Sequence, residues 1–300
     1  MNGLITLILI LTPMFIGFAL PAHQGLVKAA ERALNYLIYL ILIVIGIELG
    51  LVDDLAQKVG EIALYLSTLV VLTISFGLVA LWLFDHRSQT RTHAPHTKTK
   101  ISLGGSLVQL GCLALGFVMA SVLPASFLPP QGSTTALLMA LLFLVGISLK
   151  GAGVTLKEAM LNKKGVQISL VFMAATLLSG VVFALIFENV SITKGLALSS
   201  GFGWYSLSGT VMTDAYGAVW GSVALLNDLT REILALIFIP YVMRHSSSAA
   251  IGLGGVTSLD FTLPTLTASG GTQIIPTIIS FGFITNVISP ILMVFFSALG

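Results

Sequence analysis

The sequence predicts an all-α polytopic membrane protein with about eight transmembrane helices, two re-entrant segments and inverted repeats. Of its 300 residues, 56% are hydrophobic and only 9% are charged, and the mean hydropathy is +1.02. An ordinary soluble domain carries about 25% charged residues, so these charges are too few to cover a soluble surface. The composition therefore excludes soluble enzymes, nucleic-acid-binding proteins and disordered chains. The single cysteine, Cys112, also excludes an intramolecular disulfide and a thiolate metal cage.

Eight apolar runs have the length that can cross a bilayer as a helix, about 20 residues. We expect these helices at residues 4–21, 34–51, 60–84, 105–123, 134–149, 166–187, 223–243 and 274–298. The first run resembles the apolar core of a signal peptide. A signal peptide has a basic region before that core, whereas here Lys28 and Arg32 follow it. The first helix is therefore predicted to remain uncleaved.

Basic residues are divided unevenly between the two sets of loops. The loops after the second, fourth and sixth helices carry only Lys58 and Lys194. The loops after the first, third, fifth and seventh helices carry most of the other basic residues. These others are Lys28, Arg32, Arg87, Arg91, Lys98, Lys100, Lys150, Lys157, Lys163, Lys164 and Arg244. Because short basic loops stay in the cytoplasm, both termini are predicted to lie outside it. The basic tract at residues 85–103 is interpreted as a cytoplasmic linker that fixes this topology, rather than as a nucleic-acid-binding arm.

Residues 195–222 and 250–273 are rich in Gly, Ser and Thr, poor in charge, and contain no long apolar helix. A loop exposed to water would carry more charge. Irregular backbone is tolerated inside a membrane only where it lines a protein-enclosed, aqueous cavity, so we interpret both stretches as re-entrant segments. The alternative is two weak spanning helices and ten crossings, which would place Arg244 outside the cytoplasm.

The first half of the chain repeats itself. Residues 42–49 match residues 142–149, and Gly17-Phe18 match Gly116-Phe117. Each copy holds three helices, and an odd number of crossings inverts the second copy in the membrane. In the second half, Ser206, Leu207 and Thr210 match Ser258, Leu259 and Thr262 more weakly. Within a single transporter domain, 1–300, we predict three-helix repeats at 1–84 and 104–187, and units of a re-entrant segment plus a helix at 195–243 and 250–298.

Inverted repeats with interrupted helices are typical of secondary transporters, whose binding site lies near the middle of the membrane. Such breaks leave N–H groups that bind anions and carbonyl groups that bind cations. Hydroxyl groups at the breaks can add ligands, and the candidates are Tyr205, Ser206, Ser208, Ser258 and Thr262. The alternatives are close helix packing by small residues and, for Trp204 and Tyr205, anchoring at the membrane interface.

Ionisable residues inside a bilayer cost at least about 2.5–3.5 kcal/mol each and are functional candidates by default. The run at 223–243 carries Asn227, Asp228, Arg231 and Glu232, and the second re-entrant segment carries Asp260. Asp228 and Glu232 share a helix face, and their repulsion favours keeping a proton on one of them. Arg231 can pair with Asp228, which would leave Glu232 to exchange a proton or meet a substrate.

The alternative for these residues is a structural cluster in which Arg231 neutralises both acids. Glu48 lies near a membrane edge, where a carboxylate reaches water, and is assigned no role. All five histidines lie in loops or at helix ends, and the chain has neither a phosphate-binding loop nor a His-Glu-x-x-His zinc motif. An aspartyl-protease pair of Asp228 and Asp260 is disfavoured because residues 252–255 lack the acid of the presenilin-type motif. We therefore predict no enzymatic activity, no cofactor and no metal.

Three stretches, 201–209, 227–232 and 257–264, resemble the LysO family of bacterial lysine exporters, and the likeness extends over essentially the whole chain. The resemblance implies a multi-pass inner-membrane protein that exports L-lysine and its analogue thialysine, with proton antiport as the coupling. The paired acidic residues of the family fall here on Glu232 and Asp260.

On this interpretation, a carboxylate at Glu232 or Asp260 receives the lysine ammonium group, and half-helix N–H groups receive its α-carboxylate. Protons arriving from the periplasm compete for the same acids. The partners expected are lysine, thialysine, protons and the lipid bilayer, with no nucleic acid. The alternative is an ion-coupled importer or a sodium/proton antiporter of the same architecture.

Overall fold

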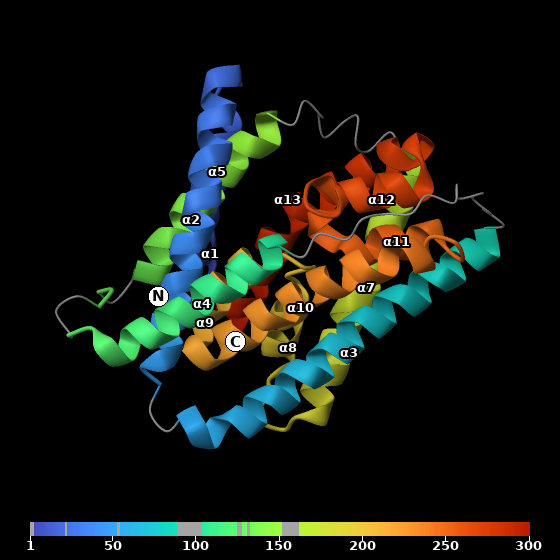
Figure 1. Ribbon diagram of the computed structural model, residues 1–300. Coiled ribbons are helices and arrows are strands. Elements are labelled where there is room, and N and C mark those ends of the chain that lie inside the picture. Colours follow the sequence, from blue (N-terminus) through green and yellow to red (C-terminus); the bar gives the residue numbers. More distant parts are fainter. Residues whose placement is uncertain are drawn as a thin grey trace.

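The computed structural model describes residues 3–21, 23–52, 55–88, 104–124, 128–130, 133–151 and 162–300. Within these ranges all regular secondary structure is helical, and long helices pack around shorter ones (Figure 1). The long helices are α1 Gly3–Ala19, α2 Gln24–Gly50, α3 Leu55–Ser88, α4 Gly104–Val122, α5 Ser133–Gly151, α7 Lys163–Ile186, α10 Ala218–Val242 and α13 Ile275–Leu299. They fall on the eight predicted apolar runs, and the predicted all-α polytopic membrane class is confirmed.

Several helix boundaries differ from the sequence prediction, most of all the start of α2. Helix α2 begins at Gln24, well before residue 34, because a helix can continue through polar residues where it is exposed. Helix α3 extends to Ser88 and so includes Asp85, which the sequence prediction placed in the linker at 85–103. Residues 89–103 lie outside the described residues. In the described part of the chain, five segments are long and apolar enough to cross a membrane: Gln24–Gly50, Lys58–Arg87, Ser133–Gly151, Lys163–Ile186 and Thr272–Leu299.

Short helices fill the two stretches that the sequence predicts to be re-entrant. Between α7 and α10 lie α8 Ile192–Ser199 and α9 Tyr205–Tyr216. Between α10 and α13 lie α11 Ser247–Gly254, the 3-10 helices η2 Gly255–Leu259 and η3 Thr272–Ile274, and α12 Leu263–Gly270.

The first of these segments begins and ends at the same end of the bundle. The ammonium group of Lys194, at the start of α8, lies 4.8 Å from the ring centroid of Tyr216 at the end of α9. It also lies 4.7 Å from the ring of Trp220, at the start of α10. The amide of Asn189 donates to the hydroxyl of Tyr65 and places the beginning of α3 at this end too. Residues 192–216 therefore enter and leave the bundle together, as a re-entrant segment does.

The second segment begins and ends at the opposite end. The hydroxyl groups of Ser246 and Ser248 donate to the carboxylate of Asp85, near the end of α3, at 2.7 and 2.6 Å. At the other limit of the segment, a Cβ on Gly270 would lie 3.0 Å from the sulfur of Met243, which follows α10. Both segments therefore have re-entrant geometry, from opposite ends, rather than that of two further crossings.

Close glycine contacts join α1 to α5. A Cβ on Gly17 would lie 2.2 Å from the carbonyl oxygen of Phe143, and a Cβ on Gly146 would lie 2.1 Å from that of Met14. Neither position has room for a side chain, so only glycine permits this approach of the two backbones.

The packing of α2 against α4 repeats this arrangement at the matching positions of the two sequence copies. A Cβ on Gly116 would lie 2.0 Å from the carbonyl oxygen of Ile43, and one on Gly46 would lie 2.2 Å from that of Leu113. Helices α3 and α7, the third members of the two predicted copies, pack together and run in opposite directions (Figure 1). These are the contacts that two inverted copies of one three-helix unit would make.

Candidate functional site

The two re-entrant segments meet at their turns, which we call tip 1 (residues 200–204) and tip 2 (residues 255–262). The N–H of Val256 donates to the carbonyl oxygen of Phe202 at 3.0 Å. A Cβ on Gly255, whose φ is 58°, would lie 2.1 Å from the same oxygen. Glycine at this position therefore allows both the turn and the close approach of the two tips.

Four polar residues of α10 lie beside these tips, and all are buried. The exposed fractions of Asn227, Asp228, Arg231 and Glu232 are between 1% and 3%. Burial of charged groups at membrane depth requires partners that satisfy them. The partners of Asp228 and Arg231 are different segments of the chain.

Asp228 binds tip 1. Its carboxylate accepts hydrogen bonds from the hydroxyl of Ser208 and from the backbone of Gly203, and it accepts one from the amide of Asn227 at 3.0 Å. A Cβ on Gly201 would lie only 2.4 Å from Oδ2 of Asp228. The carboxylate therefore sits in the break between α8 and α9, at the start of α9.

Arg231 binds the end of α11, next to tip 2. Its guanidinium group donates to the carbonyl oxygens of Gly252 at 2.5 Å and of Leu253 at 3.3 Å, and lies 4.8 Å from the ring centroid of Phe172. No ion pair joins Arg231 to Asp228 in the described part of the chain. The two charges still attract each other electrostatically, as the expected pairing requires, but the hydrogen bonds of Arg231 go to carbonyl groups at a helix end.

Helix α13 also contacts both tips. The hydroxyl of Ser289 donates to the carbonyl oxygens of Ser200 at 2.8 Å and Gly201 at 3.2 Å, and the amide of Asn286 donates to that of Val256 at 3.1 Å. Each tip is thus held between α10 and α13.

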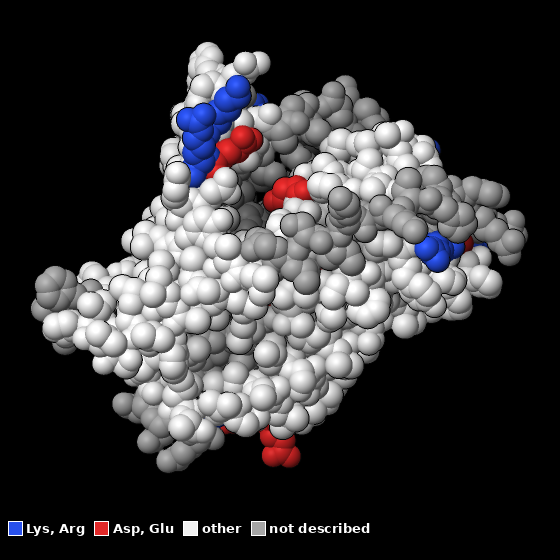
Figure 2. Space-filling view, viewed as in Figure 1, with Lys and Arg blue, Asp and Glu red and all other residues white. Residues whose placement is uncertain are grey.

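Tyr205, at the start of α9, lies within electrostatic reach of both Glu232 and Asp260. The charges of both acids act on the Tyr205 hydroxyl, which also accepts a hydrogen bond from the amide of Gln109 in α4 at 2.7 Å. Glu232 is buried, whereas Asp260, in tip 2, is exposed. The surface is hollowed between α12 and the helices α2 and α5, with acidic atoms on both sides of the hollow (Figure 2). The two acids that the sequence singles out therefore both act electrostatically on one hydroxyl group, Glu232 from a buried position and Asp260 from an exposed one.

Apart from Tyr205, the hydroxyl groups predicted as ligands divide into two pairs. Those of Ser208 and Thr262 bond within the chain, to Asp228 and to Thr257 respectively. The Oγ atoms of Ser206 and Ser258 are buried and have no hydrogen-bond partner in the described structure. Ser206 lies in α9 and Ser258 in η2, so the weak repeat of the second half does not place them at equivalent points.

Some polar residues of the site were not predicted from the sequence. Gln109 is buried in α4, and its Oε1 atom has no partner among the described residues. An amide inside an apolar run was the signal that could have revealed it.

Glu48 lies away from these residues. It accepts a hydrogen bond from the hydroxyl of Thr134, and the charge of Asp214, near the end of α9, acts on it. It therefore lies toward the end of the bundle where α9 finishes, away from tip 2.

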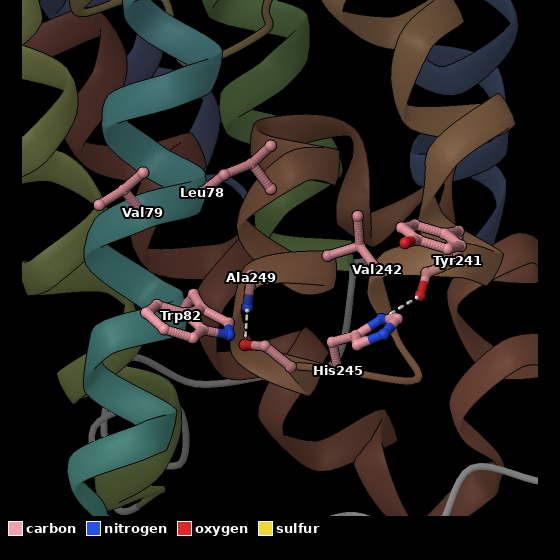
Figure 3. Close-up of a pocket in the computed structure, with 8 residues that line it drawn as sticks. Leu78, Val79, Trp82, Tyr241, Val242, His245 and Ala249 are labelled. Carbon is pink, nitrogen blue, oxygen red and sulfur yellow. Dashed lines mark hydrogen bonds between the residues drawn. The ribbon is translucent and has the colours of Figure 1, made fainter.

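An apolar groove of about 290 Å³ lies on another face, between α3, α10 and the start of α11 (Figure 3). Leu78 and Trp82 line one side, and Val242 and His245 line the other. The lining includes no carboxylate, so this groove does not suit a cationic substrate.

The fold and the site together define a polytopic membrane protein whose buried charges gather where two re-entrant segments meet. The family described as "Lysine exporter LysO" matches residues 110–297, and the chain belongs to this family. The resemblance drawn from the three motifs is thereby confirmed, and the family is one of transporters.

Two relatives agree with this assignment. The lysine exporter LysO of Escherichia coli K12 is 37% identical over 296 residues, which cover 97% of this chain and 99% of the relative. A Haemophilus influenzae protein whose name also includes the words lysine exporter is 50% identical over 169 residues, 56% of this chain and 86% of that protein. No solved structure gives a significant match to the chain.

Proposed function

We propose that this protein exports L-lysine and thialysine across the bacterial inner membrane by proton antiport. The observation that carries the proposal is the presence of two acids, Glu232 in α10 and Asp260 in tip 2, beside the meeting point of the two segments, where the Oγ atoms of Ser206 and Ser258 have no partner in the described structure. The name of the Escherichia coli relative supports lysine as the substrate.

The chemistry of the site suits an amino acid with a second ammonium group. Lysine carries a compact point charge on a flexible four-carbon stem, and a carboxylate at Glu232 or Asp260 can receive it. The Oγ atoms of Ser206 and Ser258, which lack partners in the described structure, can bind the α-ammonium or α-carboxylate group.

Coupling follows from competition for the same acids. A carboxylate that binds the lysine ammonium cannot hold a proton at the same time, so protons that arrive from the periplasm displace lysine outward. Because Asp260 is exposed and Glu232 is buried, we propose that Asp260 meets the substrate first and that Glu232 is reached deeper in the site.

We further propose that residues 1–84 and 104–187 are inverted repeats and that both termini lie in the periplasm. The reciprocal glycine contacts of α1 with α5 and of α2 with α4 support the repeats. The uneven division of Lys and Arg between the loops supports the orientation.

The test is transport in proteoliposomes loaded with radiolabelled lysine. When the outside is made more acidic than the lumen, we expect protons to enter and lysine to leave for the acidic outside, and an excess of thialysine in the lumen should slow its release. Lysine movement that follows a sodium gradient and ignores the pH gradient would favour the alternative of sodium coupling. Absence of lysine movement under both gradients would contradict the proposed substrate.

A further inference from the structure

Helices α10 and α13 each hold both re-entrant segments, through side chains three positions apart. On α10, Asp228 binds tip 1 and Arg231 binds the end of α11 beside tip 2. On α13 the order is reversed, since Asn286 binds tip 2 and Ser289 binds tip 1. The reversal follows from the opposite directions of the two helices, and the four residues form a clasp around the tips.

We propose that Asp228 and Arg231 are positioning residues that fix the two tips against each other, and that neither binds lysine nor carries the coupled proton. The proposal deepens the proposed function and rests on it only for its kinetic readout. It assigns the transport chemistry to Glu232 and Asp260 alone among the predicted charged residues.

The sign of each charge matches the helix end that it contacts. Asp228 lies at the start of α9 and accepts from Ser208 and Gly203, where unpaired N–H groups make the helix end positive. Arg231 lies at the end of α11 and donates to the last carbonyl groups of that helix, where the helix end is negative. The charge of each buried side chain thus offsets the opposite partial charge of the helix end that it contacts.

The hydrogen bonds of these two residues are also occupied by fixed groups. Both carboxylate oxygens of Asp228 accept from side chains of the chain itself, namely those of Ser208 and Asn227. Arg231 spans two carbonyl groups and lies over the ring of Phe172. A charge held in this way would have to release a tip before it could bind a transported cation, whereas Asp260 is exposed.

Hydrogen–deuterium exchange of the full-length protein in nanodiscs tests the clasp without any transport measurement. In Asp228→Ala, exchange of peptides over 199–208 should accelerate about tenfold or more, because a buried donor loses its partner, while peptides over 251–262 should change little. In Arg231→Ala, exchange of peptides over 251–262 should accelerate by a similar factor, while peptides over 199–208 should change little. Phe238→Leu, at an exposed position of the same helix, is the control and should accelerate neither tip. Unchanged exchange at tip 1 in Asp228→Ala would overturn the proposal.

Conservative variants keep the test decisive if the alanine variants fail to fold. Asp228→Asn retains one acceptor oxygen for Ser208 and Gly203 but loses the charge and the acceptor for Asn227, so it should lower the rate of lysine export without altering its pH profile. Ser208→Ala removes the same hydrogen bond from the other side and should loosen tip 1 only. Arg231→Lys keeps a donor and a charge, and should recover part of the export that Arg231→Ala loses.

Kinetics separate positioning from a merely structural role. Loss of folded protein would lower the maximal rate at an unchanged KM, whereas a displaced tip should raise the KM for lysine about tenfold. A loss of pH dependence in Asp228→Asn, with both tips exchanging as in the natural protein, would show that Asp228 carries the proton. If the natural protein moves no lysine, the proposed function fails, and the exchange data still decide whether the clasp exists.

Discussion

Glu232 and Asp260 act on the same hydroxyl group, that of Tyr205, although Glu232 is buried in α10 and Asp260 is exposed in tip 2. The two acids therefore face a shared position from different environments. A group that must exchange with water and a group that must be shielded from it are both needed where a cation and a proton use one site.

Neutral amides at these two acids should abolish export. Glu232→Gln and Asp260→Asn keep the volume and much of the hydrogen bonding but cannot hold an exchangeable proton. If the acids only held helices together, the amides would be tolerated, because a neutral side chain is cheaper at membrane depth. Growth on thialysine in a strain without other exporters measures export, and a blot measures abundance.

Asp228→Asn is the matched control for these variants, since it changes the same chemistry on the same helix. It should retain measurable resistance to thialysine at a lowered rate of export. Normal resistance from Glu232→Gln or Asp260→Asn at normal abundance would remove that residue from the proton-coupled mechanism.

The Tyr205 hydroxyl should contribute to substrate affinity. Tyr205→Phe removes the group on which both acids act and leaves the amide of Gln109 without its acceptor. We expect the KM for lysine to rise about tenfold, the effect of one lost hydrogen bond to a charged group. Tyr216→Phe, at the far end of α9, is the control and should leave the KM unchanged. Equal effects of the two changes on uptake by inverted vesicles would argue against a role for Tyr205 in binding.

The orientation of the protein in the membrane can be tested with cysteines placed at the two ends of α7. Lys163 and Glu188, which flank α7, are both exposed. In a Cys112→Ser background, Lys163→Cys should react with an impermeant thiol reagent only after the cells are opened, and Glu188→Cys should react in intact cells. The basic residues near the start of α7 are the reason for this expectation. The reverse labelling pattern would invert the topology proposed here.

Periodicity and composition were sufficient to predict the eight long helices and the two stretches of short helices between them. They also ranked Glu232 and Asp260 first, because charged residues stand out in an apolar chain. They did not reveal the hydrogen-bond partners of Arg231, since spacing along a helix points only to the nearby Asp228, whereas Gly252 and Leu253 are brought there by the second segment. Contacts between residues that lie far apart in the sequence cannot be inferred from the spacing along one helix.

Asp85 illustrates the same limit. Its neighbours in sequence are charged and polar, which suggested a solvated linker at 85–103. In the fold it is only 6% exposed, because the hydroxyl groups of Ser246 and Ser248 replace water around the carboxylate. The two serines lie too far along the chain for the pairing to be read from local pattern.

The reciprocal glycine contacts lead to a paired prediction about stability. Gly17→Ala and Gly116→Ala should each destabilise the protein by roughly 1–3 kcal/mol, because the added Cβ would lie 2.2 and 2.0 Å from a backbone oxygen of the facing helix. Because the two positions match in the proposed repeats, the two losses should be similar. Thermal unfolding in detergent, followed by light scattering, measures them.

Gly60→Ala is the control for this pair, because a Cβ at Gly60 in α3 would meet no atom within 4 Å. Alanine is a better helix former than glycine by about 1 kcal/mol, so this change should leave the unfolding temperature unchanged or raise it. If Gly17→Ala and Gly116→Ala behaved like Gly60→Ala, α1 and α4 would not approach their partners closely, and the contacts that support inverted repeats would be lost. If only one of the two were destabilising, the helix pairs would pack differently, and the proposed equivalence of residues 1–84 and 104–187 would fail.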